Sequence, residues 1–488
     1  MLKISDYFKL NKTQQELDFV DIDFNGDIPL FLDPYFISKR NSDIATEGLE
    51  SIQTFFSLLI IYLRKGYEEK AASLMEFVGE INEIHLGLSK NKSQGKGIGK
   101  DDTLRLIESI KSSKALETGL IENLEDCRLF IDNIGKDKIS DLCANIMKKQ
   151  LLDYTVEQCN LWNIPLEEAS SGFYWDSVSR EWTQKLNYKR LIIDGKPVLL
   201  VPKELVSYST SYCMEKYIQH FVLNFFQNEH LRLDTALVRK KLDKNGKIVK
   251  RWVTKKSIRE DFNKNGIIIN KAWLVDFSNK HPDILDEYRK NAHITDFDIF
   301  GEDVTPDKLN GIIDSIISRL SNIPEGKDYA TAYHHLVLGA CEFLFYPTLT
   351  NPKKEYGINE DRKRIDIVFY NTAKTGIFNE ICNRFKISLN LLMIECKNYS
   401  KDIANPELDQ MAGRLSYDKG MFGIIFCRHL YNEHLFIQRE QDTYKAENKI
   451  IIHITDDRLI QLLNIHKDFF DNAYEELISK WIDEVCVL

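Results

Sequence analysis

The sequence lacks the features that mark secreted, zinc-binding and membrane-spanning proteins. Its nine cysteines are scattered singly with no CxxC pair, so neither a disulfide framework nor a zinc knuckle is expected. The first residues, MLKISDYFKLNKTQQELDF, contain no apolar segment of signal-peptide length, and the apolar run at 55–63 is too short to span a bilayer. We therefore expect a cytoplasmic protein with reduced cysteines and no membrane partner.

A complete phosphate-binding loop is also missing. The segment SQGKGIGKDDT at 93–103 has three residues rather than four between Gly95 and the Gly99-Lys100 pair. Asp101 stands where a Ser or Thr would bind Mg²⁺, so the segment fails the pattern of nucleotide-hydrolysing enzymes. We expect a loop that opens the helix DDTLRLIESIKSS.

The length and composition predict a folded protein of more than one domain. A chain of 488 residues exceeds what one hydrophobic core usually serves, and 43% hydrophobic with 28% charged residues is ordinary for a globular protein. The formal net charge of -9 argues against a protein that coats nucleic acid over its whole surface. This net charge is compatible with a local basic patch.

Hydrophobic patterning divides the chain into three expected regions. Successive amphipathic helices predict a mainly helical domain at 1–170, which would serve sensing, regulation or assembly. A mixed region follows at 171–325, and two apolar runs around Asp194-Gly195 predict a β-hairpin near its start. Alternating helices and strands from 326 to 488 predict a compact α/β unit, so the fold class is multidomain α+β and α/β.

One segment of the middle region is strongly basic. Residues 238–259, VRKKLDKNGKIVKRWVTKKSIR, hold ten Lys or Arg against one Asp, and Asn245-Gly246 predicts a hairpin turn. Clustered cations bind nucleic acid by displacing counterions from phosphates. A solvated basic ribbon without a partner is the alternative. The predicted nucleic-acid contacts in this segment are Lys240, Lys241, Lys250 and Arg251.

Opposite charges interrupt an apolar strand near the carboxyl end. In LLMIECKNYS, Glu395 and Lys397 lie two residues apart, so on a strand both side chains leave the same face. Asp366 occupies the middle of another apolar strand, KRIDIVFYN. An aspartate and a glutamate on neighbouring strands can hold a Mg²⁺ ion. Lys397 could then orient a water and balance phosphate charge, as phosphodiester hydrolysis requires.

This arrangement resembles the PD-(D/E)xK nuclease superfamily. Asp366 is followed after 28 residues by Glu395, Cys396 and Lys397, with an apolar strand before each half, and the resemblance covers about 326–465. It implies a C-terminal restriction-endonuclease-like αβββαβ domain. It also implies that Asp366 and Glu395 bind the metal, that the Cys396 carbonyl adds a ligand, and that Glu342 on the preceding helix contributes a further carboxylate.

A helix after the E-x-K strand completes the resemblance. Gln410 occupies the place of the glutamine that family members carry there, whereas Arg414 stands where a tyrosine is usual and Ile365 replaces the proline before the aspartate. The residues Leu408, Met411, Ala412 and Leu415 form one apolar stripe, which leaves Gln410 and Arg414 on another face. An arginine at this position could contact a phosphate.

Simpler interpretations of these residues remain open. Asp366, Glu395 and Lys397 could form a structural ion pair beside an edge carboxylate, and a helix glutamate such as Glu342 is commonly a solvated surface residue. We expect His334 and the adjacent His335 to pack beside the helix rather than bind metal, because neighbouring helix residues do not converge on one ion.

The sequence thus predicts a Mg²⁺-dependent endonuclease, with Mn²⁺ as an alternative ion, that hydrolyses phosphodiester bonds in DNA. By analogy, it would serve prokaryotic anti-phage defence or restriction, with a second copy of itself or a partner defence protein as further partners. A DNA repair or recombination nuclease would share the same site. A catalytically silent nuclease fold that only binds DNA is the third alternative.

Overall fold

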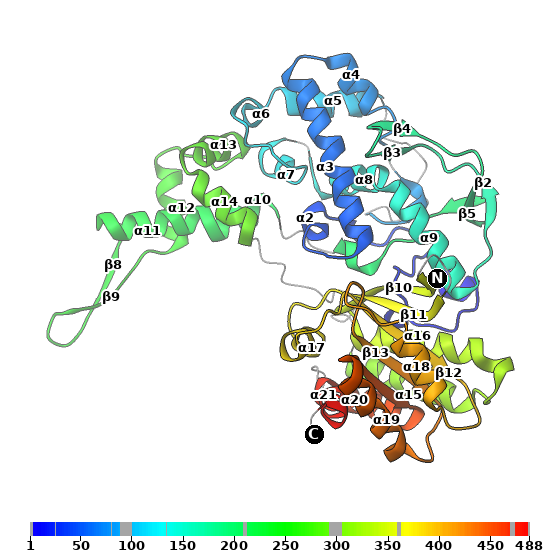
Figure 1. The fold of residues 1–488 in the computed structure, drawn as a ribbon. Helices are drawn as coiled ribbons and strands as arrows, with labels where there is room; N and C mark the ends of the chain where they lie inside the picture. The colour runs from blue at the N-terminus through cyan, green and yellow to red at the C-terminus, as the bar shows by residue number, and fades with distance from the viewer. Residues whose placement is uncertain are drawn as a thin grey trace.

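The computed structural model describes residues 3–24, 26–79, 81–87, 100–132, 134–207, 212–291, 305–358, 363–468 and 474–486. Helices and sheets are mixed along the chain, which confirms the predicted α+β class (Figure 1). The incomplete phosphate loop at 93–99 lies outside the described residues. The helix expected after it is present as α5 (Lys100–Lys111).

Helices dominate the N-terminal unit, residues 3–207 of the described chain. Its longest helix, α3, begins after Ser42, whose hydroxyl accepts the Ala45 N–H, and packs against α8 and α9. By length and composition α3 alone among the described helices could cross a membrane, but half of its apolar window is buried in this core. The helices are α1 (Ile4–Tyr7), α2 (Pro34–Ile37), α3 (Asp43–Arg64), α4 (Glu68–Leu74), α5, α6 (Lys114–Thr118), α7 (Asp126–Phe130), α8 (Lys136–Ile146) and α9 (Lys148–Trp162).

Short strands complete this unit. The predicted hairpin joins β5 to β6, and its turn residues Asp194 and Gly195 have φ values of 50° and 74°, as a two-residue turn of this kind requires. Because β3 and β5 pack on α9, residues 174–207 belong with the N-terminal helices, and the boundary predicted at 170 falls inside one unit. The strands are β1 (Phe31–Leu32), β2 (Glu167–Ala169), β3 (Tyr174–Asp176), β4 (Glu181–Thr183), β5 (Tyr188–Ile193), β6 (Lys196–Val198) and β7 (Val206–Ser207).

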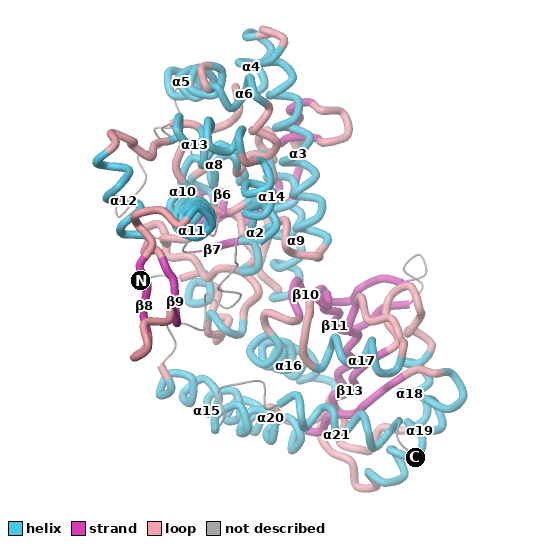
Figure 2. The backbone as a smooth tube through the Cα atoms, turned by 90° about the vertical axis from the view of Figure 1, so that its left-hand side faces the viewer, coloured by secondary structure: helices cyan, strands magenta, loops and turns pink. Residues whose placement is uncertain are grey.

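A small helical bundle with a protruding hairpin follows. Its core is aromatic, with Phe226, Phe262, Trp273 and Phe277 in mutual contact. The hairpin of β8 and β9 projects from the bundle in both views (Figures 1 and 2). The elements are α10 (Met214–Tyr217), a π-helical segment (Ile218–Val222), α11 (Leu223–Leu233), β8 (Arg239–Leu242), β9 (Ile248–Trp252), α12 (Lys255–Lys264), α13 (Lys271–Lys280) and α14 (Pro282–Asn291).

The C-terminal unit is built on a mixed sheet. Among the described residues, five strands pair in the order β10-β11-β12-β13-β14, antiparallel from β10 to β12 and parallel from β12 to β14. Helix α15 packs on α16 and α20, so this unit begins before the predicted boundary at 326. Its elements are α15 (Pro306–Asn322), α16 (Ala330–Phe345), β10 (Leu349–Ile358), β11 (Lys363–Asn371), α17 (Ile377–Phe385), β12 (Leu391–Lys397), α18 (Asn405–Ala412), β13 (Phe422–Cys427), α19 (Glu433–Glu447), β14 (Ile450–Thr455), α20 (Asp456–Asp468) and α21 (Tyr474–Cys486).

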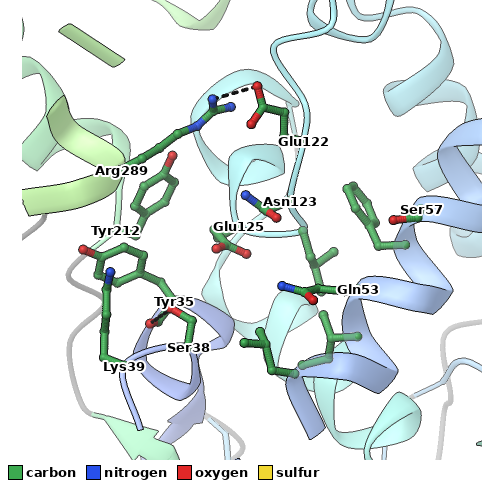
Figure 3. Close-up of a pocket in the computed structure, with 14 residues that line it drawn as sticks. Tyr35, Ser38, Lys39, Gln53, Ser57, Glu122, Asn123, Glu125, Tyr212 and Arg289 are labelled. Atoms are coloured by element: carbon green, nitrogen blue, oxygen red, sulfur yellow. Dashed lines mark hydrogen bonds and ion pairs between the residues drawn. The ribbon is translucent and has the colours of Figure 1, made fainter. Parts of the chain in front are cut away.

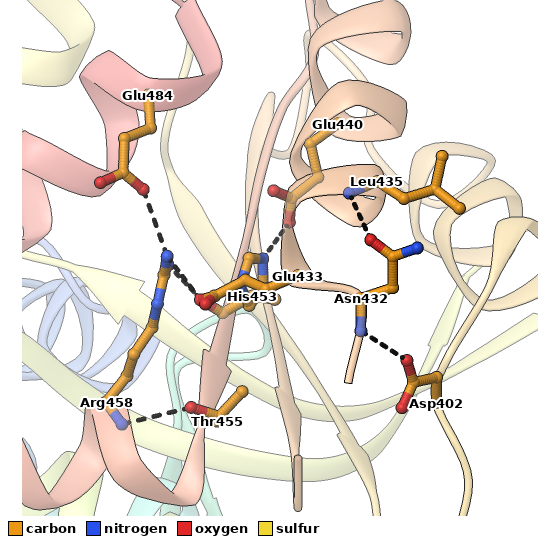
Figure 4. A network of polar contacts seen from close by, with 9 residues as sticks. All are labelled: Asp402, Asn432, Glu433, Leu435, Glu440, His453, Thr455, Arg458 and Glu484. Atoms are coloured by element: carbon orange, nitrogen blue, oxygen red, sulfur yellow. Dashed lines mark hydrogen bonds and ion pairs between the residues drawn. The ribbon is translucent and has the colours of Figure 1, made fainter. Parts of the chain in front are cut away.

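Helices cover both faces of this sheet, which explains why its central strands are continuously apolar. Met393 and Ile425 lie in the cluster with α18 and α19, whereas Ile394 and Ile424 lie in the cluster that includes α16 and α20. A buried polar network also fastens α19 and α21 to β14. It centres on His453, which contacts Glu440 and Glu433, while Arg458 contacts Glu433 and Glu484 (Figure 4).

Candidate functional site

The predicted carboxylates meet where β11 and β12 separate. The antiparallel ladder between the two strands ends at the pair Ile367 and Ile394, and the next residues are Asp366 and Glu395. The Cys396 N–H donates to Asp366 Oδ2 at 3.0 Å, and the Asp366 N–H approaches Glu395 Oε1 at 3.4 Å. The structure therefore brings Asp366 and Glu395 together at one corner of the sheet, which we call the carboxylate corner.

Two cations surround the Glu395 carboxylate. Lys397 Nζ lies 2.9 Å from Glu395 Oε2, and the Arg414 guanidinium forms an ion pair with Glu395 Oε1. Lys397 also reaches Gln410 Oε1 at 3.4 Å, so the glutamine from α18 holds the lysine in place. Glu395 is fully buried, and compensation by both cations makes its burial tolerable.

Arg414 pairs with Glu395 in this structure, and its contact with a phosphate stays a prediction. Helix α18 ends at Ala412, and the chain then turns so that Arg414 points at Glu395 rather than outward to meet a phosphate. Burial lowers the pKa of Arg414, and the nearby Asp366 carboxylate partly offsets that effect. The Arg414 guanidinium is thus paired with the Glu395 carboxylate, which is the group predicted to bind a metal.

Helix α16 places His334, one of the two adjacent histidines, beside the carboxylate corner. His334 Nε2 lies 3.1 Å from the Cys396 carbonyl oxygen and 3.8 Å from Asp366 Oδ2. His335 points elsewhere and contacts the Leu161 carbonyl at 2.8 Å. No local signal separates the two residues, because only the docking of α16 decides which ring faces β12.

The corner opens to solvent on the Asp366 side. The side chains of Asp366 and His334 are 25% and 20% exposed, whereas that of Glu395 is 1% exposed. Carboxylate and carbonyl oxygens suit Mg²⁺, and an added imidazole suits Mn²⁺. The donor types at this corner therefore fit the predicted ions.

A preformed metal centre is nevertheless not found. Within the described ranges, no three His, Cys, Asp or Glu side chains are already grouped to hold an ion. In this structure Lys397 and Arg414 contact the two Glu395 oxygens, and the Cys396 N–H donates to Asp366 Oδ2. An ion that used both carboxylates would have to displace Arg414.

The structure does not bring Glu342 to this corner. Glu342 lies eight residues beyond His334 on α16, which is about 12 Å along a helix. Its buried carboxylate lies 3.4 Å from Lys203 Nζ of the N-terminal unit. Burial, reinforced by the nearby Asp18, raises the pKa of Glu342 to about 8. Glu342 is neither a solvated surface residue nor a neighbour of Asp366, and it joins two units of the fold.

The predicted basic hairpin is present but lies away from the carboxylate corner. Its strands β8 and β9 pair around a turn in which Gly246 has a φ of 79°. Lys240 and Arg251 both contact Asp234, at 2.7 and 2.6 Å, so one carboxylate partly neutralises them. Lys241 and Lys250 face each other directly across the ladder. The hairpin lies away from α18 in both views (Figures 1 and 2).

Comparison with known proteins gives little functional information. A family model described as a domain of unknown function (DUF8370) matches residues 9–213. No curated protein matches the chain, and no solved structure does. The matched range corresponds to the N-terminal unit and ends before the hairpin and the carboxylate corner.

Proposed function

We propose that the C-terminal unit is a Mg²⁺- or Mn²⁺-dependent endonuclease that hydrolyses phosphodiester bonds in DNA. The observation that carries the proposal is the meeting of Asp366, Glu395 and Lys397 at one corner, from two neighbouring strands. The order of elements around it, with α16 before the first strands and α18 between β12 and β13, is compatible with the αβββαβ core of the PD-(D/E)xK superfamily.

Each residue of the corner has a distinct chemical task in this proposal. A divalent cation would stabilise the negative charge that develops on the phosphate. Asp366, Glu395 and the Cys396 carbonyl would hold that ion, with His334 beside them. Lys397 would orient the attacking water and offset phosphate charge, while Gln410 fixes its ammonium.

Arg414 favours a second candidate, a nuclease fold that binds DNA without cutting it. A guanidinium on Glu395 competes with a metal for the same oxygens. In the nuclease proposal, Arg414 instead leaves Glu395 when an ion enters and contacts a phosphate oxygen, for which its planar fork is suited. The two candidates differ in whether Arg414 can be displaced.

We assign the activity to prokaryotic anti-phage defence or restriction by analogy, since a nuclease unit lies beside a large helical unit. The test is to incubate the full chain with supercoiled, linear, single-stranded and branched DNA, and with RNA, in Mg²⁺, Mn²⁺ or EDTA. We expect cleavage of DNA that requires the metal and is absent in Asp366→Asn. DNA binding without cleavage in either metal would identify the silent module, and a preference for branched DNA would identify a repair nuclease.

The basic hairpin is expected to supply DNA affinity rather than catalysis. Like charges that face each other across a ladder repel, so Lys241 and Lys250 are stabilised when a polyanion binds. Changing both to Glu should weaken duplex binding at least ~10-fold near 0.1 M salt and lower the log–log salt slope by about 2. Fluorescence anisotropy across a salt series measures both quantities.

The matched control is Lys65→Glu with Lys70→Glu, which makes the same charge change at exposed positions of the N-terminal unit. This control should bind DNA as the unmodified protein does. If both double variants lost DNA affinity equally, net charge and not the hairpin would govern DNA binding.

A further inference from the structure

The basic hairpin of β8 and β9 projects from a bundle that is held in place. Arg289 of α14 lies at the edge of a cavity of about 340 Å³ in the N-terminal unit (Figure 3). Its guanidinium contacts Glu122 at 3.0 Å and Asp126 at 2.9 Å. The Tyr35 ring of α2 stacks on Tyr212 of the bundle, with ring centroids 5.1 Å apart. The bundle is therefore fastened to the N-terminal unit, and the hairpin extends from a fixed support.

The two faces of the hairpin differ in their contacts. Lys240 and Arg251 lie opposite each other in the ladder, and both contact Asp234, which directly follows α11. Because side chains alternate between the faces of a strand, the next pair, Lys241 and Lys250, lies on the other face. Within the described ranges no carboxylate pairs with Lys241 or Lys250. One face is thus anchored to α11, and the other presents uncompensated positive charge.

Three apolar side chains lie between these cations and the turn. Leu242, Ile248 and Val249 are 56%, 47% and 65% exposed. Every residue from 239 to 251 is exposed, so no core covers these side chains. Adjacent exposed apolar residues indicate a contact surface rather than a solvated ribbon. The hairpin therefore presents positive charge and apolar surface together.

The dimensions of the hairpin fit one groove of DNA. Its strands lie about 5 Å apart, and the five residues of β9 span about 16 Å. The major groove of B-form DNA is about 12 Å wide and about 8.5 Å deep and admits a two-stranded β-ribbon, whereas the minor groove is about 6 Å wide. The major groove of A-form RNA is too deep and narrow for side chains to read. The shape of the hairpin thus selects the major groove of B-form DNA.

From these observations we propose that the hairpin enters the major groove of B-form DNA. Lys241 and Lys250 contact phosphates and guanine edges there, and Leu242, Ile248 and Val249 contact the C5 methyl groups of thymine. This inference deepens the proposed nuclease function and rests on its DNA substrate. It adds the form of the duplex and the groove that the protein recognises.

A membrane surface is the other partner that combines with cations and apolar residues. The turn of the hairpin carries Asp243, Lys244 and Lys247, which lie beyond the three apolar residues. These charged groups would enter a bilayer first, and a charge inside a bilayer is costly in free energy. In the DNA groove the same turn stays in contact with water. The polar turn therefore favours DNA.

The groove is tested by fluorescence anisotropy with the full chain in EDTA, so that binding is measured without cleavage. The probes are a DNA duplex, double-stranded RNA of the same sequence, and the same DNA with a glucosylated hydroxymethyl group on C5 of every cytosine, which obstructs the major groove. We expect the RNA and the glucosylated DNA each to bind at least ~10-fold more weakly than the plain duplex. Distamycin, which fills the minor groove, should change the affinity less than ~3-fold.

The apolar contact is tested by replacing thymine with uracil in the DNA duplex, which removes only the C5 methyl groups. The unmodified protein should bind the thymine duplex at least ~3-fold more tightly than the uracil duplex. Leu242→Ser with Val249→Ser should abolish this preference. Val178→Ser with Leu186→Ser, the matched control at exposed positions of the N-terminal unit, should keep it. Thermal unfolding checks each variant, and Ile248→Ser replaces the double variant if that protein does not fold.

The proposal is overturned if plain DNA, RNA and glucosylated DNA bind equally, since the hairpin would then contact only phosphates. It is also overturned if distamycin displaces the protein, or if the protein binds phosphatidylserine vesicles and not DNA. A protein that binds the probes as expected and never cleaves DNA would lose the nuclease function and keep this inference. Metal-dependent cleavage together with equal affinity for all three probes would have the opposite meaning.

Discussion

Lys397→Met should lower the rate of DNA cleavage at least ~100-fold while the protein remains folded and still binds DNA. The ammonium lies 2.9 Å from Glu395 and 3.4 Å from Gln410, where it would orient the water and offset phosphate charge. Arg414 would remain on Glu395, so the buried carboxylate keeps one cation and the fold survives. Single-turnover cleavage, DNA binding and thermal unfolding would be measured on the same preparation.

Lys401→Met is the matched control, since Lys401 is an exposed residue four positions beyond β12. The Lys401→Met protein should cut DNA at the normal rate. Asp366→Asn should abolish cleavage as well and should also weaken metal binding, because it replaces a charged carboxylate ligand by a neutral amide. If Lys397→Met were folded, bound DNA and cut at the normal rate, the mechanism proposed for this corner would be refuted.

Lys203→Met is expected to destabilise the protein by about 3–5 kcal/mol. Lys203 is fully buried between the N-terminal and C-terminal units, with its Nζ 3.4 Å from Glu342 and its main chain bonded to Asp18. Without the lysine, Glu342 and Asp18 would remain buried near each other with no cation. Denaturant unfolding would measure the loss.

A double variant distinguishes charge from packing in this contact. Lys203→Met with Glu342→Gln removes the lysine together with one of the two buried carboxyl groups, so it should recover part of the lost stability. Lys241→Met, at the exposed hairpin, should leave the unfolding free energy unchanged. If the unfolding free energy of Lys203→Met lay within about 1 kcal/mol of that of the unmodified protein, the contact would contribute no net stability.

This buried contact and the carboxylate corner share one helix. Glu342 fastens α16 to the N-terminal unit, and His334 of the same helix lies beside Asp366. Helix α16 also places the Tyr333 hydroxyl 3.1 Å from Asp456, the first residue of α20. A shift of α16 would therefore move His334 relative to Asp366 and Cys396.

The sequence by itself determined the features that depend on neighbouring residues. The two-residue period of a strand places Glu395 and Lys397 on one face, and they are in contact in the structure. Asp194-Gly195 and Asn245-Gly246 predict hairpins because these residues tolerate positive φ, and both hairpins are present. The apolar stripe of α18 is buried, as the helical spacing of its residues predicts.

Tertiary packing alone decided the partners that come from distant segments. Arg414 pairs with Glu395, and Glu342 pairs with Lys203, although each pair is separated along the chain. His334, and not His335, faces β12 because α16 docks in one rotational setting. Such contacts depend on how helices pack against the sheet, and the energy of that packing is spread over many apolar residues with no signature at the positions it brings together.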